Sequence, residues 1–283
     1  MIGQEQQLIF KQDLIAAFSL NELGQWRKFN MNTENGRIYC NIYGYCGSVS
    51  EWIKKSIELF SNNEFPLKSV SYDVNYQKLE RKSLEKFQSE FNEMHEGDVE
   101  SLFSFTIFKG KSLKVPSSWE YGIRFDQPSR ELQIFFNTSL EINHTQILVN
   151  LLKAYLDDKI VNFGYFSYET IWGKGESLDL YMEDNHTWWL ASNPRNRDIL
   201  YNSSPKLRHI YPVNIINREF LEYEDATFSF KNWIQAPGNG ILEEIGQGNW
   251  LWIVPEERLH EIGKFFYEKK LLIGVKGENF GLV

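Results

Sequence analysis

The sequence predicts an α+β fold, with mixed or antiparallel sheets and helices packed on one side. The main observation is that two stretches share one order of elements. Residues 119–168 read strand, strand, helix, strand, and residues 239–275 repeat that order. Alternating apolar residues mark the strands, and apolar residues at helical spacing mark the helices. We therefore expect a scaffold of repeated β-β-α-β units, of the ferredoxin-like or split β-α-β type.

The first 110 residues are expected to read β-α-β-α-β. Asn35-Gly36 is a pair that readily adopts positive φ in a hairpin turn. Ser48 or Ser50 can cap the first helix, because a serine hydroxyl accepts a hydrogen bond from a free amide there. The expected elements are strands over 26–32 and 37–46, a helix over 51–60, a strand over 68–76, a charged helix over 79–91 and a strand over 99–108.

The remaining residues carry the repeated order, and we predict a boundary near residue 110. This divides the chain into an N-terminal half, 1–110, and a C-terminal half, 111–283, packed closely together. The expected elements are strands over 119–125 and 131–136, a helix over 145–156, a strand over 160–168, short helical pieces over 215–220 and 226–235, strands over 241–245 and 250–254, a helix over 255–269 and a strand over 271–275.

Composition and charge limit the classes of partner. Hydrophobic residues make up 42% of the chain and charged residues 24%, which is typical of a globular protein. The net charge of −8 disfavours nucleic acid as a ligand, because affinity for phosphates comes from clustered lysine and arginine. An acidic surface instead favours a basic protein partner. The sequence gives no indication of an oligomeric state.

The sequence predicts a cytoplasmic protein that does not span a membrane. Residues 1–19 lack a basic region followed by an uninterrupted apolar stretch, so no signal peptide is expected. No stretch approaches the roughly 18 apolar residues that cross a bilayer. Cys40 and Cys46, on one expected strand, would lie about 20 Å apart, too far for a disulfide. A reducing compartment is the simplest explanation.

No motif indicates catalysis, so we predict no catalytic residues, no metal and no cofactor. Gly173-Lys174-Gly175 lacks the rest of a phosphate-binding loop, and no G-x-S-x-G is present. His260-Glu261 begins like a zinc-protease helix, but Lys264 stands where the second histidine is needed. These observations favour a binding protein over an enzyme.

The irregular segment 173–207 is the predicted binding surface, because loops carry recognition more often than regular elements. Trp188 and Trp189 are the expected anchors. An acidic rim just upstream consists of Glu176, Asp179, Glu183 and Asp184. The alternative hypothesis is an enzyme or a small-ligand module with a pocket between the halves. That pocket would be lined by Tyr168, Trp172, His186, Trp188 and Trp189.

Several stretches between residues 144 and 275 have a shared hydrophobic pattern. They are Leu207–Ile216 with its Asn214, Phe220, Gly240–Glu243, Leu251–Val254 and Leu271–Gly274, with the helix Ile147–Leu156 and the strand Val161–Ser167 before them. This pattern resembles immunity proteins of bacterial polymorphic and contact-dependent toxin systems. The resemblance implies a protein that neutralises a toxin by covering its active site. A related possibility is an inhibitor in a phage-defence conflict.

Overall fold

The fold is known from a computed structural model, which describes residues 36–45, 47–74, 78–95, 99, 102–127, 130–157, 161–170, 207, 209–246 and 248–272. The strands are β1 (Gly36–Tyr43), β2 (Ser69–Val74), β3 (Lys78–Ser83), β4 (Leu102–Gly110), β5 (Trp119–Asp126), β6 (Glu131–Asn137), β7 (Phe163–Thr170), β8 (Val213–Asn217), β9 (Glu224–Asp225), β10 (Phe228–Ser229), β11 (Ile241–Gly246) and β12 (Asn249–Ile253). The helices are α3 (Val49–Asn62), α4 (Leu84–Glu93), α6 (His144–Tyr155), α9 (Arg218–Leu221), α10 (Phe230–Trp233) and α11 (Leu259–Glu268), with 3-10 turns η2 (Pro116–Ser118) and η5 (Glu256–Arg258).

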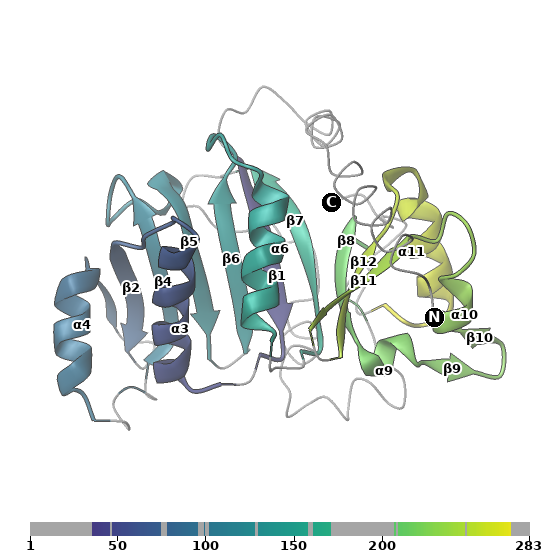
Figure 1. The fold of residues 1–283 in the computed structure, drawn as a ribbon, viewed down its shortest axis with the longest axis horizontal. Helices are drawn as coiled ribbons and strands as arrows, with labels where there is room; N and C mark the ends of the chain where they lie inside the picture. The colour runs from purple at the N-terminus through teal and green to yellow at the C-terminus, as the bar shows by residue number, and fades with distance from the viewer. Residues whose placement is uncertain are drawn as a thin grey trace.

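One large sheet organises these elements. Its strand order is β11-β12-β8-β7-β1-β6-β5-β4-β2-β3, and β9 pairs with β10 separately. Every neighbouring pair in the large sheet is antiparallel. An α+β fold with a large antiparallel sheet and helices is therefore confirmed. Figure 1 shows the sheet with α3, α4 and α6 in front of its N-terminal strands.

The helices begin where side-chain caps satisfy free backbone amides. The hydroxyl of Ser48 accepts a hydrogen bond from the Glu51 amide at 3.1 Å and so starts α3, as predicted. The side-chain oxygen of Asn143 accepts one from the Gln146 amide at 3.1 Å and starts α6. Both helices lie close to their predicted ranges, because apolar periodicity and caps are local signals.

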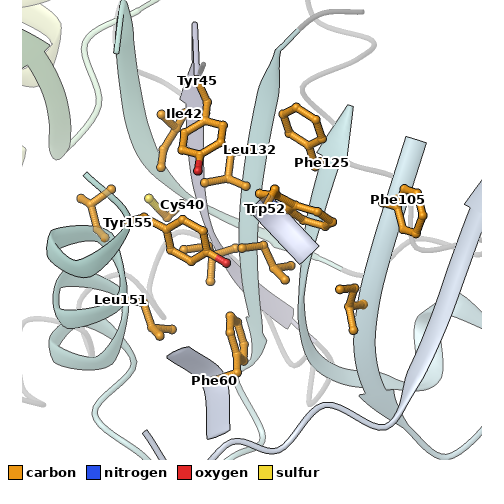
Figure 2. Packing of buried hydrophobic residues seen from close by; sticks show 14 of the residues in the cluster. Cys40, Ile42, Tyr45, Trp52, Phe60, Phe105, Phe125, Leu132, Leu151 and Tyr155 are labelled. Atoms are coloured by element: carbon orange, nitrogen blue, oxygen red, sulfur yellow. The ribbon is translucent and has the colours of Figure 1, made fainter. Parts of the chain in front are cut away.

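Strand alternation divides the sheet into two faces with different roles. On β1, Ile38, Cys40 and Ile42 face α3, α4 and α6, and we call this side the helix face. Figure 2 shows its core, in which Trp52 of α3 lies against Phe125 of β5 with ring centroids 5.3 Å apart. The alternate side, which carries Arg37 and Tyr39, we call the loop face.

The C-terminal strands carry helices on the other side of the sheet. Trp252 of β12 packs against Phe266 of α11 at 5.3 Å, whereas the adjacent Leu251 belongs to the core of the helix face. Because successive strand residues point to opposite faces, α11 lies on the side opposite α6. The predicted placement of helices on one side is therefore wrong for this end of the sheet.

Two local predictions are also corrected. The charged helix expected over 79–91 begins only at Leu84, because Lys78–Ser83 forms the edge strand β3 and pairs with β2. Lysines and glutamates on such an edge discourage pairing with other chains. Of the helical piece expected over 215–220, residues 215–217 belong to the buried strand β8, held between β7 and β12, and only residues 218–220 lie in the short helix α9.

The two expected halves contribute to the same sheet. Strand β1, from the first half, lies between β6 and β7 of the second half. The boundary near residue 110 falls between β4 and β5, which are neighbouring antiparallel strands. The division into two halves stays a prediction.

The described helices do not include a membrane span. None of them is both long enough and apolar enough to cross a bilayer.

Candidate functional site

The predicted binding segment lies almost entirely outside the described residues. This applies to Trp172, Glu176, Asp179, Glu183, Asp184, His186, Trp188 and Trp189. Tyr168 is placed in β7, where it pairs with Ile38 of β1. The interface and the pocket assigned to these residues stay predictions.

A different site stands out on the loop face, where β4 passes into β5. The two strands pair regularly until Lys109 opposite Tyr121, after which Gly110 lies opposite Trp119. The extra residue, Glu120, forms a β-bulge. Such bulges redirect side chains at the end of a pairing. Consequently Tyr121 points into the core of the helix face, whereas Trp119 packs on the loop face.

Trp119 completes a small aromatic cluster on the loop face. Its ring stacks on Phe108 with centroids 3.8 Å apart, and Tyr39 and Phe135 complete the cluster. Gly122 provides the space, because a Cβ atom there would lie 2.8 Å from both Phe108 Cβ and Phe135 Cζ. The cluster forms a firm base beneath the β4–β5 loop (residues 111–118).

Arg37 attaches this loop to the base. Its side chain is buried, and its guanidinium carbon lies 5.0 Å from the ring centroid of Phe135. One terminal nitrogen, Nη2, donates hydrogen bonds to the carbonyls of Pro116 and Trp119, the second at 2.8 Å. Charge-assisted hydrogen bonds of this kind are stronger than neutral ones. A residue of β1 thus holds the loop that precedes β5.

Hydrogen bonds within the loop fix the rest of its course. The indole nitrogen of Trp119 donates to the carbonyl of Ser112 at 3.0 Å. The amide of Lys111 donates to the carbonyl of Ser118 at 3.2 Å and so closes the base. The hydroxyl of Ser118 donates to the carbonyl of Val115 at 2.7 Å. These bonds hold the backbone of the loop at Ser112, Val115 and Ser118.

The loop presents apolar and basic side chains to solvent. Leu113 is 38% exposed and Val115 47% exposed. Lys111 and Lys114, which lie beside them in the sequence, are exposed as well. Lys109 pairs with Glu120 at 3.4 Å, whereas Lys111 and Lys114 make no ion pair with any residue that the structure describes. Two aliphatic side chains and two lysines thus lie exposed within one short loop.

A polar ladder adjoins this site across three strands of the loop face. The amide nitrogen of Gln133 donates to the side-chain oxygen of Asn41 at 2.7 Å. Asn41 in turn donates to the hydroxyl of Ser167 at 3.3 Å. These groups satisfy one another, so the ladder ties β6, β1 and β7 together and stiffens the base.

Two further buried groups, the imidazole of His144 and the thiol of Cys40, have shifted pKa values. Burial lowers the pKa of His144, whose Nε2 donates to the carbonyl of Asn137 at 3.0 Å. Burial raises the pKa of the Cys40 thiol, which lies in the core and is not in a disulfide. Within the described ranges, no group of three or more histidine, cysteine, aspartate or glutamate side chains is placed to hold a metal ion.

The β4–β5 loop is not among the sites predicted from the sequence. A usable signal was present, because residues 109–119 contain three lysines and no acidic residue in a chain of net charge −8. Leu113 and Val115 alternate with those lysines between turn-forming serine and proline residues. The attachment by Arg37 could not be seen, since 82 positions separate it from Trp119.

Comparisons with known proteins give little further information. No protein-family model matches the sequence, and no curated protein matches it significantly. Among solved structures, the Pseudomonas aeruginosa T6SS protein PA0821 is similar, with a TM-score of 0.45 and 13% sequence identity. The match covers 77% of this chain and 64% of that protein, so the chain spans less than two thirds of its length. A likeness at this level carries no argument about function.

Proposed function

We propose that this chain is a non-enzymatic binding protein of the bacterial cytoplasm, and that it neutralises a protein partner by covering it. In this proposal the scaffold consists of two β-β-α-β units set into one sheet. The partner is a toxin, so that the chain acts as an immunity protein. An inhibitor in a phage-defence conflict would act through the same kind of contact.

The observation that carries the proposal is the exposure of Leu113 and Val115 on a loop that the fold holds in one conformation. A loop that is ordered before binding loses little conformational entropy when a partner binds. When a partner covers water-exposed aliphatic side chains, the free energy falls by about 25 cal/mol per Å² of apolar surface buried. Together these features suit a recognition surface.

The choice of a toxin as partner rests on the sequence. The pattern across Leu207–Ile216, Leu251–Val254 and Leu271–Gly274 resembles the C-terminal half of immunity proteins. In the structure, Leu207 and Leu272 form an isolated parallel bridge, and β8 and β12 are neighbouring strands. The described parts of these three segments therefore lie close together.

Co-expression tests this function. The tagged full-length chain would be purified from its native bacterium, and each co-purifying protein would be expressed in a laboratory strain with and without the chain. We expect one of these proteins to arrest growth alone and the chain to restore growth. The proposal fails if no co-purifying protein is toxic, or if toxicity persists while the two proteins form a complex.

The same purified chain tests the alternative of a small-ligand module. A thermal-shift screen with nucleotides and metal ions would measure its melting temperature. Under the proposed function we expect no ligand to raise it appreciably. A rise of several degrees would show a ligand present well above its Kd and would favour the alternative.

A further inference from the structure

We propose that the β4–β5 loop inserts Leu113 and Val115 into an apolar hollow of the protein partner, and that carboxylates on the rim of that hollow pair with Lys111 and Lys114. This inference rests on the proposed function and adds the chemistry of the contact. The loop side chains, their exposure and their charges carry it.

The apolar and charged side chains of the loop must be covered together. Lys114 stands between Leu113 and Val115 in the sequence, and all three are exposed. A partner that buries the two aliphatic side chains therefore also removes water from nearby ammonium groups. Removing water from an ammonium group is costly unless an opposite charge replaces it. The partner accordingly needs carboxylates close to its apolar hollow.

The local charge of the loop is opposite to that of the whole chain. The chain carries a net charge of −8, yet residues 109–119 carry lysines and no acidic residue. Complementary charges raise the rate of association and set the orientation of the two proteins. The overall charge of the chain predicts a partner that is basic as a whole. The acidic rim proposed here is limited to the part of the partner that contacts this loop.

An acidic protein surface fits these charges better than an anionic membrane or a nucleic acid. Protein segments that bind anionic lipid usually contain a cluster of about four to eight basic residues. The loop itself supplies Lys111 and Lys114, and the net charge of −8 would repel an extended phosphate surface. A protein surface can place a few carboxylates locally and present apolar groups between them.

The rigidity of the loop indicates that the partner supplies a matching shape. Direct hydrogen bonds from Arg37 and from the indole of Trp119 hold two loop carbonyls, those of Pro116 and Ser112, and a third from Arg37 holds the carbonyl of Trp119 where β5 begins. Gly110 is packed so closely that an added Cβ would lie 2.7 Å from Trp119 Cα. Side chains that project from so constrained a loop require a preformed hollow opposite them.

Photocrosslinking in the native bacterium tests this proposal. The full-length chain would carry p-benzoylphenylalanine at position 113, and the crosslinked peptide would be identified by mass spectrometry. We expect a partner peptide whose aspartate or glutamate residues adjoin apolar ones. Reversing those acids to lysine should restore binding to the Lys111→Glu/Lys114→Glu variant. That rescue is specific to direct charge pairing.

Matched variants separate the loop from general effects of charge and exposure. With the purified partner, Lys111→Glu/Lys114→Glu should slow association by about tenfold at low salt. The control Lys54→Glu/Lys86→Glu makes the same change in net charge at exposed lysines of α3 and α4. We expect the control to change the association rate by less than about twofold.

Several outcomes overturn the inference. They are crosslinks to a second copy of this chain, to lipid or to nucleic acid, no crosslink at all, a partner hollow without carboxylates, and equal effects of the two charge-reversal pairs. The proposed function is judged separately, because it depends on growth rescue by the unaltered chain. If the unaltered chain rescues growth and the loop variants rescue it equally well, the function stands and this contact is wrong.

Discussion

The two faces of strands β1, β6 and β5 are made from alternating residues of the same segments, yet they are built in different ways. On the helix face, Ile38 and Ile134 lie in a large apolar core shared with three helices. On the loop face, Arg37 lies over Phe135, which belongs to a small aromatic cluster that carries a loop. Both faces keep the apolar side chains of these strands from water, but the loop that the second face carries exposes Leu113 and Val115.

Within a single strand, residues of the helix face therefore contribute mainly to stability, whereas residues of the loop face support a loop proposed to bind a partner. A substitution on the helix face removes packing from a buried core, and its cost should appear in the free energy of unfolding. A substitution at the tip of the β4–β5 loop removes side chains that the fold does not bury. Between these extremes lies Arg37, which is buried but serves to position the loop.

The largest effect on stability is expected from Trp52→Ala. Trp52 is fully buried between Phe125 and Phe105, with ring centroids 5.3 and 6.1 Å away. Its loss should lower the free energy of unfolding by about 3–5 kcal/mol, because truncating a buried aromatic side chain leaves a cavity. Urea denaturation measures this. A loss below about 0.5 kcal/mol, as expected for a surface substitution, would contradict the assigned core.

An intermediate effect is expected from Arg37→Lys. A lysine keeps the charge but lacks the planar guanidinium that lies over Phe135, and its shorter side chain moves the donor away from the carbonyls of Pro116 and Trp119. We expect a loss of about 1–3 kcal/mol in stability.

Hydrogen exchange shows whether that loss lies in the loop. In the Arg37→Lys variant the amides of Lys111 and Ser118, which bond within the loop, should exchange faster. The amide of Ile134, inside β6, should exchange as before. Equal acceleration at all three amides would mean that Arg37 supports the whole sheet rather than the loop.

A smaller, pH-dependent effect is expected from His144. Burial holds its pKa below the ordinary 6.5, so the folded protein keeps the ring neutral. The unfolded chain binds the proton at higher pH, and stability should therefore fall as the pH drops below about 6.5. In His144→Gln this part of the pH dependence should be absent. Urea denaturation at several pH values between 7 and 5 compares the two, and identical slopes would refute the assignment.

The comparison also explains which features the sequence could reveal. Alternation and caps are local, so β5, β6, α3 and α6 were predicted close to their observed ranges. Strand β3 was read as part of a helix because its polar residues have no apolar alternation, and only pairing with β2 fixes its conformation. Local patterns contain no information about such pairing.

Features that depend on contacts between distant residues could not be predicted. The insertion of β1 between β6 and β7 joins residues far apart in the sequence. The same holds for the candidate site, because Arg37 reaches Pro116 across 79 positions. Leu113 and Val115 can be recognised as a candidate binding surface only when the attachment of their loop by Arg37 is known. The predicted site around Trp188 and Trp189 lies outside the described residues and stays a prediction.

The central claim is that the β4–β5 loop serves binding and not folding. Its most direct test combines urea denaturation with equilibrium binding to the purified partner for Leu113→Ser/Val115→Ser, with the exposed Leu79→Ser of β3 as control. We predict an unchanged free energy of unfolding, within about 0.5 kcal/mol, for both variants. We also predict at least about a tenfold loss of affinity for the loop variant alone, since two covered aliphatic side chains are lost. A loop variant that binds normally, or one that loses stability as Trp52→Ala does, would contradict the account.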